Sequence, residues 1–298
     1  MTTKLVLGTA NFGLTYGIAN NRMLSEKEAF AILAKALEVG VSGVDTARGY
    51  GDAEKVLGRF FRGHGKVFNV VTKLPDGEYR VAGDVERQIT TSLEHLGIER
   101  IDTLLLHSFR SFERFSDVLL PVFERYRSAG IIGGYGLSVY HPYEIETATE
   151  TAGQAGFCIG AAQFPLNLFD QRFLKSGHLQ RLRASGITLY GRSIFLQGLF
   201  FMGGASLGGH LQQVTPKIER LASLAKMYNT SVEALALLFA ASSGVDYVVL
   251  GVDSVAQLEK NAALMANGTM SLLPKLKSEF DMFEISDEEV ILPCRWRQ

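Results

Sequence analysis

The chain has 298 residues, 47% of them hydrophobic and 20% charged, and its formal net charge is -1. Thirty basic and thirty-one acidic residues offer no broad electrostatic attraction for nucleic acid or for an anionic membrane surface, so we expect neither as a partner. Two distant cysteines and six scattered histidines argue against a disulfide framework and against a bound metal. No signal-peptide segment is evident and the longest apolar run, residues 234–241, is too short to span a bilayer, so we expect a cytoplasmic protein.

Short apolar segments alternate with amphipathic segments along almost the whole chain. The expected strands are residues 4–8, 43–46, 67–73, 103–107, 135–138, 159–163, 188–192 and 247–251. The expected helices are residues 25–39, 52–62, 84–96, 116–129, 142–152, 170–184, two helices within 216–242 that meet near Asn229, and 254–266. The first helix shows the signals clearly, because Ser25 and Glu28 have capping-box spacing and Gly40 ends the apolar repeat.

Strand–helix units of this size and number predict an α/β fold, a closed (β/α)8 TIM barrel formed by one domain over residues 1–298. Continuous apolar strands favour a parallel sheet that is covered on both faces. A doubly wound open sheet is the competing fold, but the eight units and the lack of a GxGxxG motif after the first strand argue against it. The residues from Pro274 onward follow the eighth unit, and we expect them to form a C-terminal tail over the barrel mouth.

Polar side chains follow the apolar runs at the points where the expected strands end. They are Asp45, Lys73, His107, Ser138, Gln163 and Arg192, and Tyr50 lies in the loop after the second strand. A barrel gathers the carboxyl ends of its strands at one mouth, where its active site lies. We therefore expect these side chains to converge, although each of them alone is more typical of an ordinary solvated loop.

Four of these residues together suit proton donation to a carbonyl oxygen. A free tyrosine hydroxyl titrates at about pH 10, and an ammonium such as Lys73 beside Tyr50 is expected to lower that pKa toward the working range. Asp45 would supply the counter-charge that a buried Lys73 needs, and His107 would donate a hydrogen bond to the substrate oxygen. The set has no evident nucleophile, so the reducing equivalent is expected to come from a hydride cofactor.

The motifs around these residues resemble those of the aldo-keto reductase superfamily over nearly the whole chain. They are LGTANFG at 7–13, GVDTARGYGDAEKVLG at 43–58, VVTKL at 70–74, IDTLLLH at 101–107, YGLSVY at 135–140, AAQFPLNLF at 161–169, YGRSIFLQGL at 190–199 and LGVDSVAQLEKNAAL at 250–264. The resemblance implies a catalytic tetrad of Asp45, Tyr50, Lys73 and His107. It also implies an oxidoreductase, monomeric or multimeric, that reduces the aldehyde or ketone group of a small molecule such as a sugar with NADPH, less often with NADH.

The same resemblance implies where the cofactor binds. Ser138 and Gln163 are expected at the nicotinamide carboxamide, and Arg192 stands where the family has an aromatic residue that stacks on the nicotinamide ring. The other implied cofactor residues are Gly8, Thr9 and Ala10 after the first strand, Ser193, Phe195, Leu196 and Gln197 after the seventh, and Gly251, Asp253, Ser254, Gln257 and Asn261 after the eighth. Positions 251 and 257 lack the basic residues with which many members hold the 2′-phosphate of NADPH, so only a modest preference for NADPH is expected.

Further residues are candidates to shape the substrate pocket. They are Tyr16, Arg48, Phe109, Arg110 and the tail residues 294–297. The arginines near the mouth favour an anionic substrate such as a sugar phosphate or a nucleotide sugar.

Other functions remain open at this point. Lys73 near Tyr50 is compatible with a barrel aldolase that forms a Schiff base, although such a lysine must be neutral and Asp45 opposes that. A cofactor-binding, redox-sensing regulatory subunit is the second alternative. A glycosidase is disfavoured, because the fourth and seventh strands end in His107 and Arg192 rather than in a pair of carboxylates.

Overall fold

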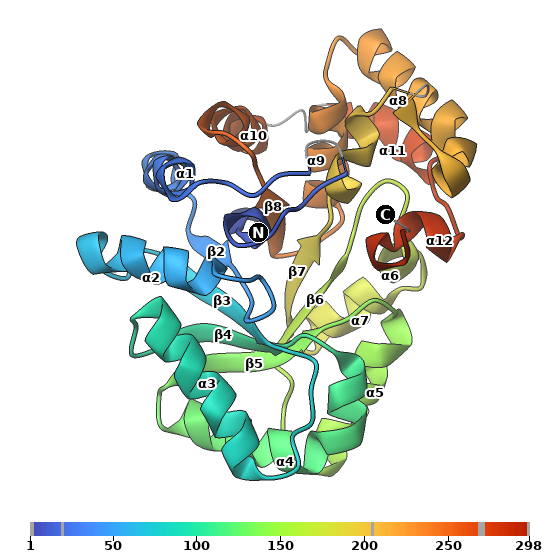
Figure 1. Cartoon of the computed structure of the whole chain (residues 1–298). Helices are drawn as coiled ribbons and strands as arrows, with labels where there is room; N and C mark the ends of the chain where they lie inside the picture. The colour runs from blue at the N-terminus through green and yellow to red at the C-terminus, as the bar shows by residue number, and fades with distance from the viewer. Residues whose placement is uncertain (1–2, 19–20, 204–205, 268–271, 297–298) are drawn as a thin grey trace.

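The strands close into one parallel barrel in sequence order, with β8 pairing back onto β1 (Figure 1). They are β1 Lys4–Gly8, β2 Gly43–Asp45, β3 Asn69–Leu74, β4 Ile101–Leu106, β5 Ile132–Ser138, β6 Ala161–Pro165, β7 Thr188–Arg192 and β8 Tyr247–Gly251. The structure is a computed structural model, and it describes residues 3–18, 21–203, 206–267 and 272–296. The predicted (β/α)8 TIM barrel is therefore confirmed, and the open doubly wound sheet is wrong.

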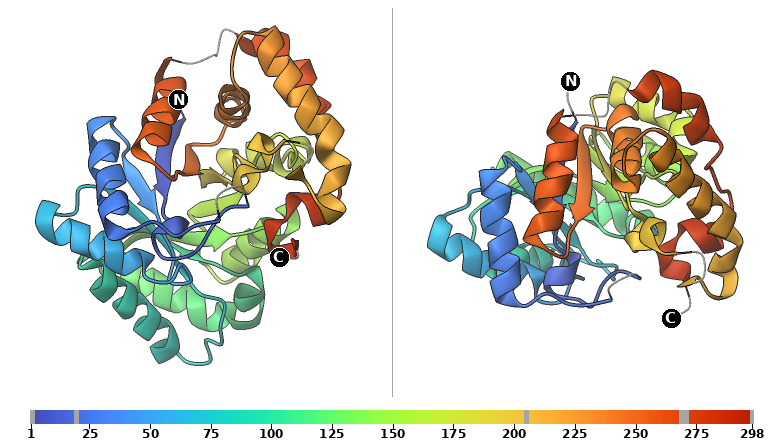
Figure 2. Two further views of the ribbon diagram at one scale, coloured as in Figure 1. Left: turned by 45° about the horizontal axis from the view of Figure 1, so that its top comes forward. Right: turned by 90° about the horizontal axis from the view of Figure 1, so that it is seen from above.

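Helices follow the strands and cover the outside of the barrel (Figures 1 and 2). They are α1 Glu26–Glu38, α2 Ala53–His64, α3 Ala82–Leu96, α4 Phe109–Ser128, α5 Pro142–Gln154, α6 Arg172–Lys175, α7 His178–Ala184, α8 Thr215–Met227, α9 Val232–Ser242, α10 Val255–Asn267, α11 Leu273–Asp281 and α12 Glu288–Ile291. The predicted capping box at the start of α1 is present, because the Glu28 carboxylate accepts from Ser25 N at 2.8 Å and Ser25 caps in return.

The apolar side chains form two separate clusters. One cluster lies inside the barrel and consists of Val6, Val71, Leu105, Ala161, Tyr190 and Val249. The larger cluster lies between the strands and the helices. Burial on both faces explains the continuous apolar runs in the sequence.

The interior cluster also explains why the polar strand ends meet. Side chains two positions apart on a strand share a face. Lys73, His107, Gln163 and Arg192 each follow a member of the interior cluster by two residues. Their side chains therefore face the axis of the barrel at the carboxyl ends of the strands.

Several boundaries differ from the sequence expectation by one or two residues, and three elements differ by more. The helix expected at 170–184 is two short helices, α6 and α7, separated by Gly177 with φ 72°. Helix α4 begins at Phe109 rather than at 116, and its backbone is non-helical at Phe115. Strand β5 begins at Ile132, three residues before the expected start. Its first half contains Gly133 and Gly134, and glycine has a low strand propensity, so the sequence pattern did not predict this part of the strand.

The C-terminal segment runs along the outside of the barrel and then reaches the mouth (Figure 2). Helix α11 lies against α9, and Glu279 on α11 pairs with Arg220 on α8 at 3.0 Å. After α12, Trp296 Nε1 donates to the backbone oxygen of Val290 at 3.0 Å, which folds the tail back on itself. Pro293 and Cys294 line the cavity at the mouth, so the predicted position of the tail is confirmed.

Candidate active site

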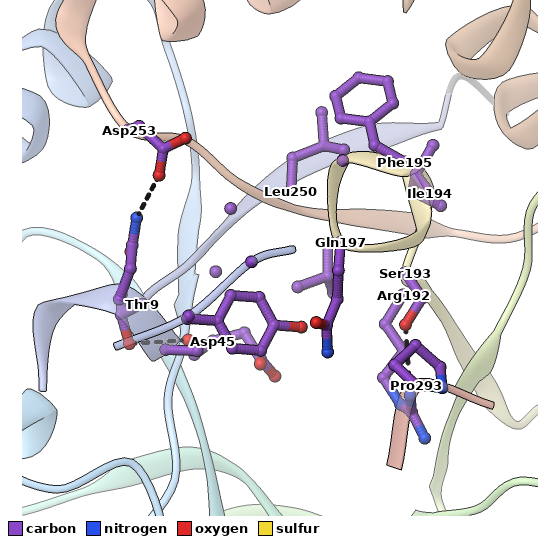
Figure 3. Close-up of a pocket in the computed structure, with 18 of the residues that line it drawn as sticks. Thr9, Asp45, Arg192, Ser193, Ile194, Phe195, Gln197, Leu250, Asp253 and Pro293 are labelled. Atoms are coloured by element: carbon purple, nitrogen blue, oxygen red, sulfur yellow. Dashed lines mark hydrogen bonds between the residues drawn. The ribbon is translucent and has the colours of Figure 1, made fainter. Parts of the chain in front are cut away.

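A cavity of about 630 Å³ opens among the carboxyl ends of the strands. Three members of the implied tetrad line it, namely Asp45, Tyr50 and His107. The predicted cofactor residues that line it are Gly8, Thr9, Ala10, Arg192, Ser193, Phe195, Gln197, Gly251, Asp253, Gln257 and Asn261. Figure 3 shows Asp253 on one side of this cavity and Arg192 with Pro293 on the other.

Asp45 joins two other strand-end residues in a buried network. Its Oδ1 accepts from Lys73 Nζ at 2.6 Å, and its Oδ2 accepts from Gln163 Nε2 at 2.6 Å. Lys73 Nζ also donates to the backbone oxygen of Thr46 at 3.0 Å. Lys73 is completely buried and Asp45 is only 3% exposed, so each charge depends on the other for compensation. The expected counter-charge for Lys73 is thus present, and Lys73 itself lies behind the lining of the cavity.

The ring of Tyr50 lies beside this network and lines the cavity together with Asp45. Lys73 Nζ is 5.2 Å from the centroid of the Tyr50 ring, in a cation–π arrangement. The imidazole of His107 meets the same ring edge to face, with 5.8 Å between the ring centroids. Because Tyr50 and His107 both line the cavity, one small molecule can contact both polar groups.

The pKa of Tyr50 differs from the expectation drawn from the sequence. Burial raises this pKa, the charge of Asp45 raises it further, and Arg192 lowers it. Lys73 does not reverse the shift, because Asp45 compensates its charge at 2.6 Å. The expectation that Lys73 brings the pKa of Tyr50 below its ordinary value is therefore wrong, and the phenol is held in its protonated form.

His107 is also held neutral. Burial lowers its pKa to about 3, and the positive charges of Lys73 and Arg192 act in the same direction. A neutral imidazole keeps one N–H donor and one acceptor nitrogen. The expected hydrogen-bond donor in the cavity is therefore available at neutral pH.

Two glycines fix the loop that carries Tyr50. Gly13, in the segment after β1, lies so close to this loop that a Cβ on it would stand 2.0 Å from the backbone oxygen of Tyr50. Gly51 has φ 56°, and a Cβ there would stand 2.2 Å from the oxygen of Gly13. The two backbones can approach this closely only because both residues lack a side chain.

The loop after β7 has an unusual backbone. Ser193, Leu196 and Gln197 have φ values of 61°, 46° and 55°, which are left-handed and costly for residues other than glycine. Gln197 O accepts from Ile18 N at 3.0 Å, and this contact connects the loop to the segment after β1. The side chain of Leu196 is fully buried in the core, so only its backbone is available to a cofactor.

The start of α10 forms the side of the cavity around Asp253. Asn11 Nδ2 donates to Asp253 Oδ1 at 3.1 Å, and Arg22 Nη2 donates to the backbone oxygen of Asp253 at 2.9 Å. Gln257 Oε1 accepts from Asp253 N at 2.8 Å, and Ser254 Oγ accepts from Gln257 N at 3.3 Å. Ser254 thus caps the helix from an exposed position outside the cavity lining.

Several residues that line the cavity were not predicted from the sequence as site residues. They are Asn11, Tyr140, Glu233 and Lys260, among others. Lys260 Nζ pairs with Glu233 at 2.6 Å across α10 and α9. The spacing of Gln257 and Lys260 places both on one face of α10 and is a usable sequence signal. Glu233 has no such signal, because only the packing of α9 against α10 brings it to the cavity.

The residues expected to shape the pocket are only partly at the cavity. Tyr16 and Cys294 line it. Arg48 Nη1 instead lies 2.7 Å from His95 Nδ1 and 3.5 Å from the Glu54 carboxylate, and Arg110 is exposed, so neither arginine belongs to the lining. Phe109, Arg295 and Trp296 do not line the cavity either, and Arg297 lies outside the described residues.

Within the described parts of the chain, no group of three or more histidine, cysteine, aspartate or glutamate side chains is arranged to hold a metal ion. No helix among those residues is long and apolar enough to cross a membrane.

A closed (β/α)8 barrel with its polar groups gathered at the carboxyl rim is a barrel of the enzyme type. Comparison with known proteins gives the family, because the model of the aldo/keto reductase family matches residues 4–271. The chain belongs to the aldo/keto reductase family, a class of carbonyl-directed oxidoreductases.

Individual relatives are distant. The chain is 26% identical to a D-threo-aldose 1-dehydrogenase from a Pseudomonas species, over 87% of this chain and 91% of that protein. It is 34% identical to the aldo-keto reductase str7 of Strobilurus tenacellus, over 34% of this chain and 30% of that protein. Two solved structures from Pseudomonas aeruginosa, both assigned to the aldo-keto reductases, share the fold with TM-scores of 0.65 and 0.67. Their sequence identities to the chain are 21% and 20%. Each match covers 89% of this chain, and it covers 91% and 90% of the two solved chains.

Proposed function

We propose that the chain reduces the carbonyl group of an aldehyde or ketone to an alcohol, with NADPH, or less often NADH, as the hydride donor. The observation that carries this proposal is the pair of neutral groups, Tyr50 and His107, that line one cavity above the Asp45–Lys73 ion pair. A protonated phenol and a neutral imidazole are both donors, which suits an oxygen that gains negative charge.

In this proposal Tyr50 is the general acid. A bound nicotinamide cofactor would supply the hydride for the carbonyl carbon. Tyr50 gives its hydroxyl proton to the carbonyl oxygen, and the N–H of His107 holds that oxygen in position. Lys73, 5.2 Å from the Tyr50 ring, stabilises the negative charge that proton transfer leaves on the phenol, and Asp45 keeps Lys73 in place.

The residues present fit a nicotinamide cofactor. Gln163 and Ser138 lie behind the residues that line the cavity, and the buried Oε1 of Gln163 has no hydrogen-bond partner among the residues that the structure describes. The amide N–H of a nicotinamide carboxamide would satisfy this acceptor, next to Ser138, which pairs with Gln163 in the register of β5 and β6. The loop after β7 and the start of α10 would hold the phosphates, since a helix N-terminus attracts anions.

The geometry of Lys73 argues against the aldolase alternative. A Schiff-base lysine must reach the substrate carbonyl as a neutral amine. Lys73 Nζ is instead engaged by Asp45 and by the backbone of Thr46, and the residue is completely buried behind the cavity lining. Borohydride trapping of a substrate on the protein in the absence of nicotinamide would reverse this conclusion.

The test of the proposed function is a turnover assay. The protein is mixed with NADPH or NADH and a panel of polar aldehydes and ketones, and the nicotinamide absorbance of the reduced cofactor is followed. Aldoses belong in the panel because the relative from Pseudomonas is an aldose dehydrogenase. Loss of absorbance that requires both substrate and protein supports the proposal. Tight cofactor binding without turnover of any compound would favour the regulatory-subunit alternative.

A further inference from the structure

A buried carboxylate that the proposed chemistry does not use lies behind the Tyr50 loop. Glu54 is in the first turn of α2 and is only 1% exposed. Its Oε1 accepts from Thr72 Oγ1 at 2.6 Å. Its Oε2 lies 3.5 Å from Arg48 Nη1 and 3.6 Å from His95 Nδ1. We call these four residues the Glu54 cluster, and none of them lines the cavity, so a ligand in the cavity does not contact the cluster directly.

The Glu54 cluster connects both ends of the Tyr50 loop to the strand that carries Lys73. Arg48 precedes Tyr50 by two residues and Glu54 follows it by four, so their contact closes the loop at its base. Thr72 directly precedes Lys73 on β3, and Arg48 N donates to the backbone oxygen of Lys73 at 3.1 Å. The position of the Tyr50 hydroxyl relative to Lys73 therefore depends on these contacts.

Helix α3 holds the other side of the cluster. An arginine N–H can only donate, so His95 Nδ1 is the acceptor in its 2.7 Å contact with Arg48 Nη1. His95 is in the last turn of α3, which packs against α2 (Figure 1). The two helices are so close that a Cβ on Gly58 of α2 would stand 2.1 Å from the backbone oxygen of His95. Arg48 is therefore held between two helices whose relative position is fixed.

Stability alone does not explain the Glu54 cluster. A buried carboxylate loses its hydration, and replacement of a buried ion pair by apolar side chains is often neutral or stabilising. The Arg48–Glu54 contact is long for a hydrogen bond at 3.5 Å. Arg48 Nε is also buried without a hydrogen-bond partner among the residues that the structure describes. Polar groups desolvated at this cost beside the loop of the proposed general acid indicate a role in its position.

We propose that the Glu54 cluster positions the hydroxyl of Tyr50, with Arg48 and Glu54 as positioning residues for the proton transfer. This inference rests on the proposed carbonyl reduction, in which Tyr50 is the general acid. The cluster holds the loop on the side of β3 and α3, whereas the contact of Gly13 with Gly51 holds it on the side of the segment after β1. A hydroxyl displaced by about 1 Å loses on the order of 10²-fold in rate, although substrate and cofactor still bind.

Thr72→Val is the first test, because valine has nearly the shape of threonine and removes the hydrogen bond to Glu54. We expect kcat per folded protein to fall by about 10–100-fold, while the dissociation constant of NADPH stays within a few-fold. Thr72→Ser keeps the hydroxyl and should hold kcat within about threefold of the wild type. The matched control is Thr103→Val, which removes a contact with the Tyr190 hydroxyl at 3.3 Å inside the barrel and should also leave kcat within about threefold.

Arg48→Met is the second test, because it removes the contacts with Glu54 and His95 and keeps the length of the side chain. It should lower kcat per folded protein in the same range of about 10–100-fold. Both changes are then repeated in a Tyr50→Phe background. With no hydroxyl left to position, neither should lower kcat further by more than about twofold. Thr72→Val is the milder change and decides the question if Arg48→Met does not fold.

Four results would overturn the inference. Unchanged kcat in folded Thr72→Val and Arg48→Met would refute it and leave carbonyl reduction standing. An equally low kcat in Thr72→Ser would show that packing, and not the hydrogen bond, causes the loss. An undiminished further loss in the Tyr50→Phe background would show that the cluster acts on another step. Failure of the wild type to reduce any carbonyl compound would overturn the proposed function and this inference with it.

Discussion

The hydroxyl of Tyr50 lies where its surroundings favour the neutral phenol. Burial and Asp45 both raise its pKa, and His107, the other donor in the cavity, is neutral for a related reason. A carbonyl oxygen bound between them can accept from the phenol and from the N–H of the imidazole. The same environment opposes formation of the phenolate, so the reverse reaction, oxidation of an alcohol, needs the positive charges of Lys73 and Arg192 to offset it.

Replacement of Tyr50 tests the proton donor directly. Tyr50→Phe should lower kcat by about 10²–10⁴-fold, the usual contribution of general acid catalysis, while the dissociation constant of NADPH stays within a few-fold. Tyr16→Phe is the matched control, since it removes a second phenol from the lining of the same cavity and should cost less than about tenfold. If Tyr50→Phe kept half of the wild-type kcat, or if Tyr16→Phe lost more of its kcat than Tyr50→Phe, Tyr50 would not be the general acid.

The neutral state of His107 predicts acid sensitivity. The pKa of this residue is about 3 in the folded protein against about 6.5 for a free histidine, so between these pH values the unfolded chain binds a proton that the native state does not. The free energy of unfolding therefore falls as the pH falls below about 6.5. This one group accounts for about 2–3 kcal/mol between pH 6.5 and 4.5.

Urea denaturation at several pH values measures this effect. The difference in unfolding free energy between the wild type and His107→Gln should be constant from pH 7 to 8.5 and should shrink by about 2–3 kcal/mol from pH 6.5 to 4.5. If the unfolding free energies of the two proteins changed with pH in the same way, His107 would not be held neutral in the folded protein.

The segment after β1 packs so closely on the Tyr50 loop that this contact is sensitive to the size of the side chains in it. Gly13 and Gly51 meet backbone to backbone, so the loop position depends on two missing side chains. Helix α2 begins directly after this loop, and its buried face anchors it to the barrel. A shift of the segment after β1 would therefore move the Tyr50 loop while the barrel stays closed.

Gly13→Ala is the test of this contact. A new Cβ would meet Tyr50 O at 2.0 Å and Ala53 N at 2.5 Å, so backbone must move. We expect a loss of roughly 1–3 kcal/mol of stability from overpacking and a loss of about 10²-fold in kcat from misplacement of the hydroxyl. The control is Gly63→Ala on α2, where nothing lies within 4 Å and stability should rise slightly. Unchanged kcat in Gly13→Ala would show that the loop is positioned by other contacts.

The elements also show what a single sequence can reveal. Strand ends such as Asp45 and His107 are recognisable because each follows a continuous apolar run, and the barrel brings them together without further information. The pKa of Tyr50 was not predictable, because its sign depends on how completely Asp45 compensates Lys73 and on how deeply the phenol is buried. The stacking of Arg192 on Tyr140 was not predictable either, since it depends on side-chain orientation across two strand ends.

On the scale of the whole molecule, the cavity joins segments far apart in sequence. Residues after β1, β7 and β8, a residue of α9 and the C-terminal tail all contribute to its lining. A cofactor that spans this cavity binds only the closed barrel, and such a ligand stabilises the folded state by about 2.7 kcal/mol at a hundred times its dissociation constant. Thermal unfolding therefore reports cofactor affinity independently of activity.

The preference between the two nicotinamide cofactors follows from the charges around Asp253. The start of α10 favours an additional phosphate by about 0.3–1 kcal/mol. The basic residues nearby are already paired, Lys260 with Glu233 at 2.6 Å and Arg22 with Glu28 at 2.9 Å. We therefore expect NADPH to bind about tenfold more tightly than NADH, equivalent to ~1.4 kcal/mol, in calorimetry and in thermal unfolding. A preference above about a thousandfold that Lys260→Gln abolishes would show that Lys260 leaves Glu233 for the 2′-phosphate. Tighter binding of NADH would show that Asp253 accepts a hydrogen bond from the ribose hydroxyl, the role that an acidic residue plays in many NAD sites.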